Sequence, residues 1–324
     1  MPLTNNASFI PAMDEFIAHW TQVNAALTPD LVVGLPNQEP VTLATFTALR
    51  TTLLGHYQTL TGFLTDKEIA RGDIRLRKAA LLARFNEFNA LLDGYWAGTP
   101  YLNARAYAPN LSDGQETFLK PLRDAASLWE KLNQAPAPAG ITLPLALADA
   151  TLVAGFRAQI DGLQAAYATE ANANQNAVLA RATRDAAKAL VKAVLLAYRT
   201  VVPARCAQHP TLVATLPALT PTPGHTPAPV NASAVFQAPD AAKIVHDASP
   251  EATLARYELR GNPGDAYSED DAVVIATHTP AEPREFLTTF GLTQPGAAVA
   301  LKVFTLLTTG NEAGSAAMVV ERPD

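Results

Sequence analysis

The sequence predicts a multi-domain protein in which an N-terminal antiparallel helical bundle precedes a C-terminal β-sandwich. Apolar residues recur at steps of three and four up to about residue 200, as they do on one face of a helix. A proline-rich stretch, "TPTPGHTPAPV" at 220–230, interrupts this pattern. Beyond residue 231 the apolar period changes to two, which is the period of a strand. A chain of 324 residues exceeds what most single cores hold, so about two domains are expected.

The first three predicted helices follow one another between residues 11 and 95. Residues 11–27 place five large apolar side chains on one face: Met13, Phe16, Trp20, Val23 and Leu27. The second helix ends at Leu64, and seven threonines within 42–61 lower its intrinsic propensity, so packing must supply most of its stability. The third begins at the capping box "TDKE", with Thr65 as N-cap and Glu68 reaching back to it.

Three more helices are predicted, at about 115–133, from Leu152 to Tyr167 and at about 174–200. Pro121 must kink the fourth helix or mark its true start, because proline cannot donate the backbone hydrogen bond of a helix interior. Six amphipathic helices with short connections are typical of an antiparallel bundle.

The proline run is predicted to be a linker. Its residues favour an extended, semi-rigid polyproline II path, and proline cannot continue a helix. The expected organisation is therefore a helical bundle domain at 1–205, a proline-rich linker at 206–230 and a β-sandwich at 231–324.

The region after the prolines reads as several short strands. "LARYELR", "AVVIATH", "EFLTTFGL", "AAVALKVFTLL" and "SAAMVVE" are separated by turn signals such as "GNPGD", "TQPG" and "TGNEAG". Several strands with regular turns in under about a hundred residues predict a β-sandwich.

This region resembles a fibronectin type III domain. "RYELR" is similar to strand C of that family, and "GLTQPGAAVALKVFTLLTTGNEAGSAA" is similar to its E–F turn, strand F and F–G hairpin. Two positions depart from the family pattern: His246 stands where a core tryptophan is usual on strand B, and Val299 stands where strand F carries a tyrosine. The whole layout also resembles bacterial proteins that join a helical region to a fibronectin-like domain, a resemblance that implies no activity.

Charge is divided unevenly along the chain. Residues 226–324 hold 6 Lys and Arg against 13 Asp and Glu, whereas residues 1–225 are nearly neutral. An acidic second part disfavours nucleic acid as a partner, because phosphate binding needs basic groups. Cys206, the only cysteine, cannot form an internal disulfide. No secretory signal and no apolar run long enough for a membrane span are visible, so a cytoplasmic location is expected.

The most specific surface pattern is a basic stripe at Arg181, Arg184, Lys188 and Lys192. Steps of three, four and four place these residues on one helix face. One interpretation is a site for an anion or acidic partner. The other, which the nearly neutral surroundings favour, is a solvated face supported by an Arg181–Asp185 pair.

No other pattern carries clear chemistry. Asp265, Glu269, Asp270 and Asp271 could ligate calcium, but they lack the spacing and glycine of an EF-hand. The six histidines form no metal-binding motif, and no nucleophile elbow or nucleotide-binding glycine motif is present. Cys206 beside Arg205 is only a weak nucleophile candidate. No cofactor and no metal are therefore expected.

The sequence leaves two main hypotheses, of which it favours the first, and a less favoured third in which the stripe at 181–192 binds an anion or nucleic acid. The protein is a non-enzymatic structural or interaction protein, whose bundle packs or self-associates and whose sandwich contacts a protein partner through loops or sheet edges. Alternatively, it is an enzyme with a site assembled inside the helical bundle and an accessory fibronectin-like domain.

Overall fold

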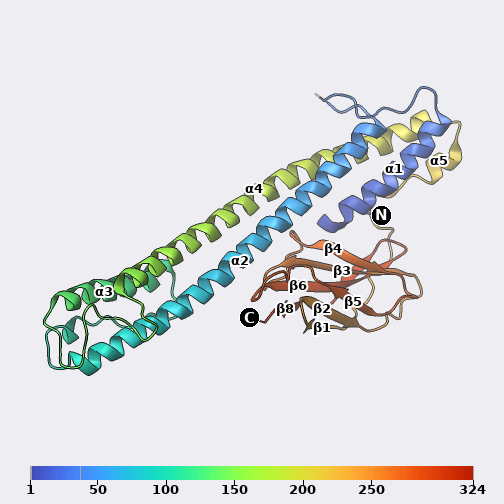
Figure 1. Ribbon diagram of the computed structural model, residues 1–324. Helices are drawn as coiled ribbons and strands as arrows, with labels where there is room; N and C mark the ends of the chain where they lie inside the picture. The colour runs from blue at the N-terminus through green and yellow to red at the C-terminus, as the bar shows by residue number, and fades with distance from the viewer. Residues whose placement is uncertain (1, 37, 324) are drawn as a thin grey trace. The chain divides into compact units, whose positions relative to one another are not determined.

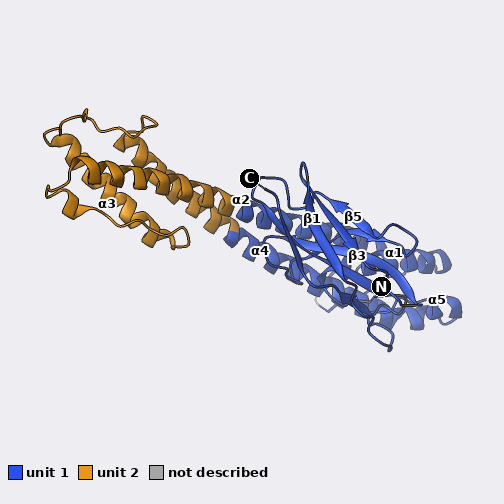
Figure 2. Cartoon of the chain, turned by 90° about the horizontal axis from the view of Figure 1, so that it is seen from below, with its two compact units in different colours: residues 1–68, 174–324 blue, residues 69–173 orange. Residues whose placement is uncertain are grey.

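The helices come first along the chain and the antiparallel sheets follow, which confirms the predicted fold class (Figure 1). The computed structural model describes residues 2–36 and 38–323. Tertiary contacts divide the chain into two compact units (Figure 2). Unit 1 comprises residues 1–68 and 174–324, and unit 2 comprises residues 69–173.

Two very long helices replace four of the predicted ones. The helices of the described residues are α1 (Phe9–Ala26), α2 (Leu43–Tyr95), α3 (Gln115–Gln134), α4 (Val153–Arg205) and α5 (Pro210–Ala214), with short 3-10 turns η1 (Asn6–Ser8) and η2 (Leu102–Ala104). The predictions of separate second and third helices, and of separate fifth and sixth helices, are therefore wrong, because α2 and α4 each run unbroken for 53 residues. None of the described helices is apolar over a stretch sufficient to cross a membrane.

The predicted capping box at 65–68 lies in the interior of α2. The hydroxyl of Thr65 donates to the carbonyl of Thr61, 2.9 Å away, as threonines within helices commonly do. A capping box needs a chain that enters from outside the helix, and here the preceding residues are already helical. Pro121 lies inside α3 without ending it.

Each unit has its own helical core. In unit 1, α1 packs against α2 and α4 through Phe16, Trp20, Phe46 and Tyr198, all fully buried. In unit 2, the ring of Trp129 on α3 stacks on Phe88 of α2 at 5.1 Å and packs at a tilt against Phe156 of α4 at 5.8 Å. These aromatic clusters explain why the threonine-rich start of α2 is helical: burial compensates for weak propensity.

The sandwich of unit 1 consists of two antiparallel sheets. Its strands are β1 (Ala232–Gln237), β2 (Ala241–His246), β3 (Leu254–Pro263), β4 (Val273–His278), β5 (Glu285–Thr288), β6 (Ala298–Leu307), β7 (Glu312–Gly314) and β8 (Met318–Glu321). One sheet has the order β1-β2-β5. The other has the order β4-β3-β6-β7, and β8 also pairs with β6. The predicted strand C is β3, and it pairs with β6, the predicted strand F, over its whole length.

The two positions that depart from the fibronectin pattern both lie in the sandwich core. His246 is buried on β2, and its ring lies 4.3 Å from that of Tyr257 and 5.6 Å from that of Phe286. Val299 is fully buried on β6. Val299 and the two ring neighbours of His246, Tyr257 and Phe286, belong to the apolar core of the sandwich.

The proline-rich segment is tied to the rest of unit 1. The amide of Leu3 donates to the carbonyl of Leu219, and the amide of Thr222 donates to the carbonyl of Thr309. The predicted linker bounds of 206 and 230 follow the change from helix to strand, whereas the compact units follow tertiary contacts. The predicted domains thus describe the order of elements along the chain, and the compact units describe which residues contact one another. The domain assignment stays a prediction.

Candidate functional site

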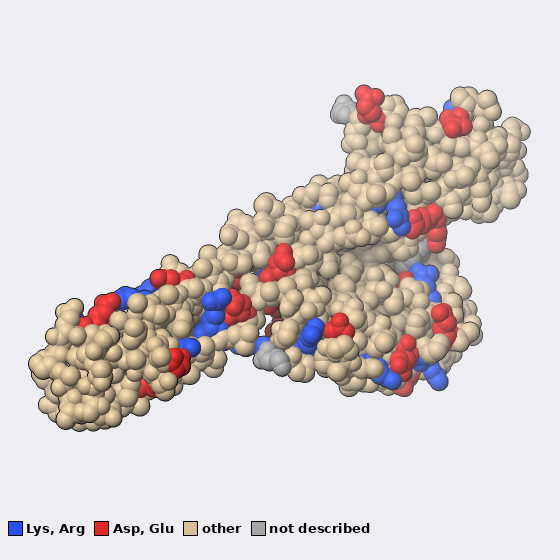
Figure 3. All heavy atoms as spheres, viewed as in Figure 1, with Lys and Arg blue, Asp and Glu red and all other residues tan. Residues whose placement is uncertain are grey.

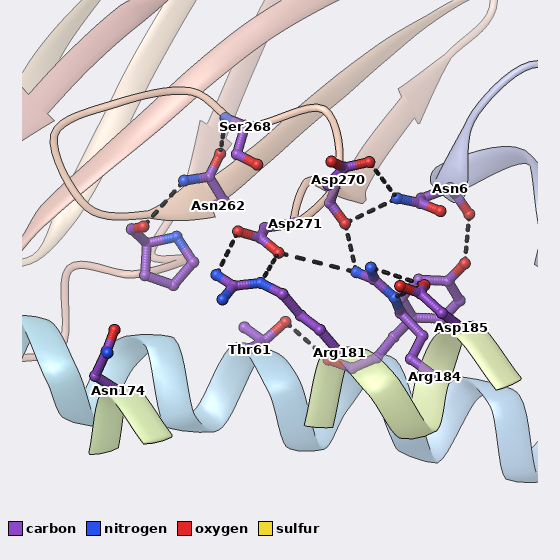
Figure 4. A network of polar contacts seen from close by, with 12 residues as sticks. Asn6, Thr61, Asn174, Arg181, Arg184, Asp185, Asn262, Ser268, Asp270 and Asp271 are labelled. Atoms are coloured by element: carbon purple, nitrogen blue, oxygen red, sulfur yellow. Dashed lines mark hydrogen bonds and ion pairs between the residues drawn. The ribbon is translucent and has the colours of Figure 1, made fainter. Parts of the chain in front are cut away.

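Arg181 and Arg184, the first two residues of the basic stripe of α4, face the loop 264–272, which joins β3 to β4 (Figure 4). Arg181 forms a two-pronged ion pair with Asp271, with nitrogen–oxygen distances of 2.7 and 2.8 Å. The side chain of Arg184 is 2% exposed, and its guanidinium donates to the backbone carbonyl of Asp270. Lys188 donates to the side chain of Asn6. We call Asn6, Arg181, Arg184, Lys188, Asp270 and Asp271 the charged interface.

The predicted solvated face is therefore wrong for Arg184, which is buried, and Arg181 does not pair with Asp185. Asp185 instead lies 3.0 Å from Arg184 and 3.1 Å from Lys188. The loop that the sequence offered as a weak calcium site supplies the acidic partner of the stripe. Anion binding by the stripe stays a prediction, but Arg181, Arg184 and Lys188 already have partners within the chain.

The N-terminal turn completes the charged interface. Asn6 donates to the carbonyl of Asp270 at 2.9 Å, and its own carbonyl accepts from the hydroxyl of Tyr57 at 2.6 Å. The loop 264–272 is held in shape by Asn262, whose side chain accepts from the amide of Ser268 at 2.8 Å. Side chains from α2, α4, η1 and the β3–β4 loop thus converge on one polar cluster.

Three groups in or beside the charged interface have a shifted pKa: Arg181, Asp185 and Tyr57. The hydrogen bond to Asp271 raises the pKa of Arg181 above its usual value. Burial works to raise the pKa of Asp185, but hydrogen bonds from Lys188 and Arg184 outweigh it and lower that pKa. Burial raises the pKa of Tyr57, so its hydroxyl stays protonated and can donate to Asn6. These contacts favour the charged forms of Arg181 and Asp185.

A second charged cluster lies on the β4-β3-β6-β7 sheet. It was not predicted from the sequence. Arg260 is 1% exposed, and its guanidinium lies 2.6 Å from both Glu258 and Glu312. It also stacks 4.0 Å from the ring centroid of Phe304, and Asn5 donates to Glu312. We call these five residues the Arg260 cluster. Its signal was present in "RYELRGN", where Arg256, Glu258 and Arg260 alternate and must share one face of a strand.

Lys192, the fourth residue of the stripe, differs from the other three. It is exposed and forms no ion pair or hydrogen bond with the described residues. It borders a cleft between α4 and the sandwich.

On the face shown in Figure 3, basic and acidic side chains are interspersed, without a broad area of one sign.

The acidic residues do not gather into a metal site. Asp271 pairs with Arg181, and Glu269 lies 3.4 Å from Lys302. Within residues 2–36 and 38–323, no group of three or more His, Cys, Asp or Glu residues could hold a metal ion.

The buried histidine of the helices serves packing. His19 lies 2.8 Å from the hydroxyl of Tyr198 and 2.8 Å from the carbonyl of Leu212. Because a carbonyl only accepts, Nε2 carries a proton and donates it to Leu212. Burial raises the pKa of the Cys206 thiol, which therefore stays protonated and weakly nucleophilic. These groups give the enzyme hypothesis no convergent pair of acid and base.

The comparisons with known proteins found no matching family model and no matching curated protein. Among solved structures, an Fn3-like protein from Clostridium thermocellum is similar at 21% identity, covering 31% of this chain and 97% of that one, with a TM-score of 0.24. The pectate lyase PelI from Erwinia chrysanthemi, in complex with tetragalacturonic acid, is similar at 22% identity, covering 28% of each chain, with a TM-score of 0.24. Pectate lyase Pel3 from Pectobacterium carotovorum is similar at 13% identity, covering 28% of this chain and 26% of that one, with a TM-score of 0.22. The chain thus spans little more than a quarter of the length of the pectate lyases.

Proposed function

We propose that the protein is a non-enzymatic structural or interaction protein, in which the helices of unit 1 hold a fibronectin-like sandwich by one sheet. The charged interface carries this proposal. The basic residues that could have bound an external anion are used to fix the β3–β4 loop against α4. Such an arrangement sets the orientation of the sandwich and leaves its other sheet open to a partner.

The strand order supports the fibronectin-like assignment. In immunoglobulin-like sandwiches, strands A, B and E share one sheet and strands C, F and G share the other. Here β1, β2 and β5 form one sheet, while β3, β6 and β7 lie side by side in the other. Sandwiches of this kind present loops and sheet surfaces to partners while their cores stay closed.

The outer face of the β1-β2-β5 sheet offers the contact surface. Val235 and Leu287 are 59% and 61% exposed, and they flank Lys243 in the register of the sheet. Val245, 44% exposed, lies on the same face. Exposed apolar side chains that are adjacent on a sheet favour contact with another protein more than scattered ones do.

Light scattering of the purified chain over a concentration series tests the proposal, with negative-stain images of the same fractions. A discrete oligomer that Val235→Glu with Leu287→Glu dissociates would support assembly through this sheet. Val319→Glu is the matched control, because Val319 is 48% exposed on β8 of the other sheet. A monomer at every concentration would contradict self-association and leave a foreign protein partner as the proposed ligand.

A further inference from the structure

A cleft in unit 1 lies beside the charged interface. Its volume is about 760 Å³, and it runs between α4, the N-terminal segment 3–6, residues 219–220 and β7. We propose that this cleft binds an extended acidic segment of a partner protein, which adds as a strand to the free edge of β7. This inference rests on the proposed interaction function and names its site and the chemistry of its partner.

The first argument is the open edge of β7. This strand ends the sheet order β4-β3-β6-β7, so only one of its two edges is paired with another strand of the described residues. In the hairpin, Leu307 bonds to Asn311 and Ser315 bonds to Val303. Hydrogen-bonded positions alternate along an antiparallel pair, so Ala313 faces β6, and Glu312 and Gly314 direct their amides and carbonyls outward.

Those outward groups open into the cleft. Glu312, Ala313 and Gly314 all line it. No other described segment forms a backbone hydrogen bond to Glu312 or Gly314. Two outward residues at i and i+2 form the repeating unit with which a sheet edge binds a further strand. The cleft therefore offers a pre-formed backbone template for an extended peptide.

The second argument is the charge that remains unpaired in the cleft. Glu312 forms an ion pair with Arg260, and Glu269 forms one with Lys302. Asp270 accepts a hydrogen bond from the side-chain amide of Asn6. Lys188 is engaged by Asn6 and Asp185. Among the described charged residues that line the cleft, Lys192 alone lacks an ion pair or hydrogen bond. The charge complement of the cleft is therefore a carboxylate on the incoming peptide.

The third argument is the apolar surface beside Lys192. Leu196 follows one turn later on α4 and is 51% exposed, and Leu3 and Leu219 line the cleft nearby. Side chains of a bound strand alternate in direction, so acidic and apolar residues at every second position would meet Lys192 and this leucine surface. The ligand class is an extended peptide that combines acidic and β-branched or apolar residues.

Selection from a phage-displayed library of random linear peptides on the immobilised full-length protein tests this proposal. We expect enrichment of acidic, strand-forming peptides whose binding is at least about fivefold weaker to Lys192→Glu. Lys131→Glu is the control, because it makes the same charge change at an exposed site on α3 outside the cleft. No enrichment, enrichment of basic peptides, or equal loss in both variants would overturn the proposal.

Two measurements on the best enriched peptide separate strand addition from simple charge attraction. Amide hydrogen exchange should slow at Glu312 and Gly314 on binding, while Ala313 stays protected with and without peptide. Methylating the backbone nitrogen of every second peptide residue should abolish binding, because those amides donate to β7. Methylating the residues between them should be tolerated. Exchange that is unchanged at Glu312 and Gly314, or N-methyl effects without this alternation, would overturn strand addition.

These results are independent of the oligomer measurement. The Val235→Glu and Leu287→Glu changes lie on the sheet opposite to β7. If no peptide binds while the oligomer responds to those changes, the cleft site is wrong and the proposed function stands. If peptide binds and no oligomer forms, the function is recognition of a foreign segment.

Discussion

Helix α4 makes two contacts of opposite character in unit 1. Toward α1 and α2 it presents apolar and aromatic side chains such as Val194 and Tyr198, which are fully buried. Toward the sandwich it presents Arg181 and Arg184, which meet carboxylate and carbonyl oxygens. Apolar burial stabilises the fold under most solution conditions. Charged contacts stabilise less, because desolvation offsets their attraction, but they select one orientation. The comparison separates a contact that depends on apolar burial from one that depends on charge.

The largest expected effect comes from the apolar contact. Trp20→Ala removes a fully buried ring whose centroid lies 4.7 Å from that of Tyr198. We expect the free energy of unfolding to fall by about 3–5 kcal/mol, because the cavity cannot close completely. Urea denaturation monitored by circular dichroism measures this loss. Leu196→Ala, at a position 51% exposed, should change it by less than about 0.5 kcal/mol. Equal losses in the two variants would contradict the assigned core.

A somewhat smaller effect is expected in the Arg260 cluster. Arg260→Met leaves Glu258 and Glu312 near one another without their shared cation. We expect a loss of about 3 kcal/mol, since Arg256 still pairs with Glu258. Adding Glu258→Gln and Glu312→Gln should recover most of it, because no uncompensated charge then remains. A triple variant that is as unstable as Arg260→Met would show that packing, and not charge, gives the cluster its role.

The charged interface should show a weaker, salt-dependent effect. Arg181 is 32% exposed and Asp271 is 10% exposed, so water screens their ion pair in part. Asp271→Asn should lower the free energy of unfolding by about 1 kcal/mol at low salt and by less at high salt. A double-mutant cycle with Arg181→Gln isolates the pair. A coupling energy of zero at low salt would contradict a role of this pair in holding the sandwich.

The smallest effect concerns pH and the sandwich core. Burial lowers the pKa of His246 below the value of about 6.5 that histidine has in an unfolded chain. Above about pH 6.5 the imidazole is neutral in both states, and the full stability is present. As the pH falls further, the unfolded chain takes up the proton first, so the free energy of unfolding decreases. Comparing denaturation of wild type and His246→Phe between pH 7 and 5 checks this: the variant should have a shallower slope, and identical slopes would exclude His246 as the cause.

The sequence predicted the fold class through periodicity, but it did not predict how the parts join. The change of apolar period from 3.6 to two can be read from neighbouring residues alone, and the structure has helices before it and strands after it. The continuity of α2 through Thr65 was missed because a capping box and a helix interior can share the same residues at i and i+3. The stripe at 181–192 was recognised as one face, and the acidic loop 265–271 was noted separately. Their pairing was invisible because Arg184 and Asp270 are 86 residues apart.

The Arg260 cluster shows a different limit of sequence reasoning. Alternating charges on β3 indicate a charged sheet face, which is normally a solvated one. Burial of Arg260 depends on cover from Asn5, Phe304 and Glu312, which belong to three other segments. No pattern within β3 predicts that these three residues bury Arg260. Contacts of this kind depend on the tertiary fold and become predictable only when it is known.

The division of unit 1 along the chain has a consequence for synthesis on the ribosome. The core partners of Phe16, Trp20 and Phe46 include Val194, Tyr198 and Cys206, which are made much later. About 160 residues separate Phe46 from Cys206, so at roughly 5–20 residues per second the aromatic face of α1 and the start of α2 wait about 8 to 30 s for their partners. Residues 69–173 are contiguous and can pack during that delay. We therefore expect the nascent chain to expose an aromatic surface during that interval.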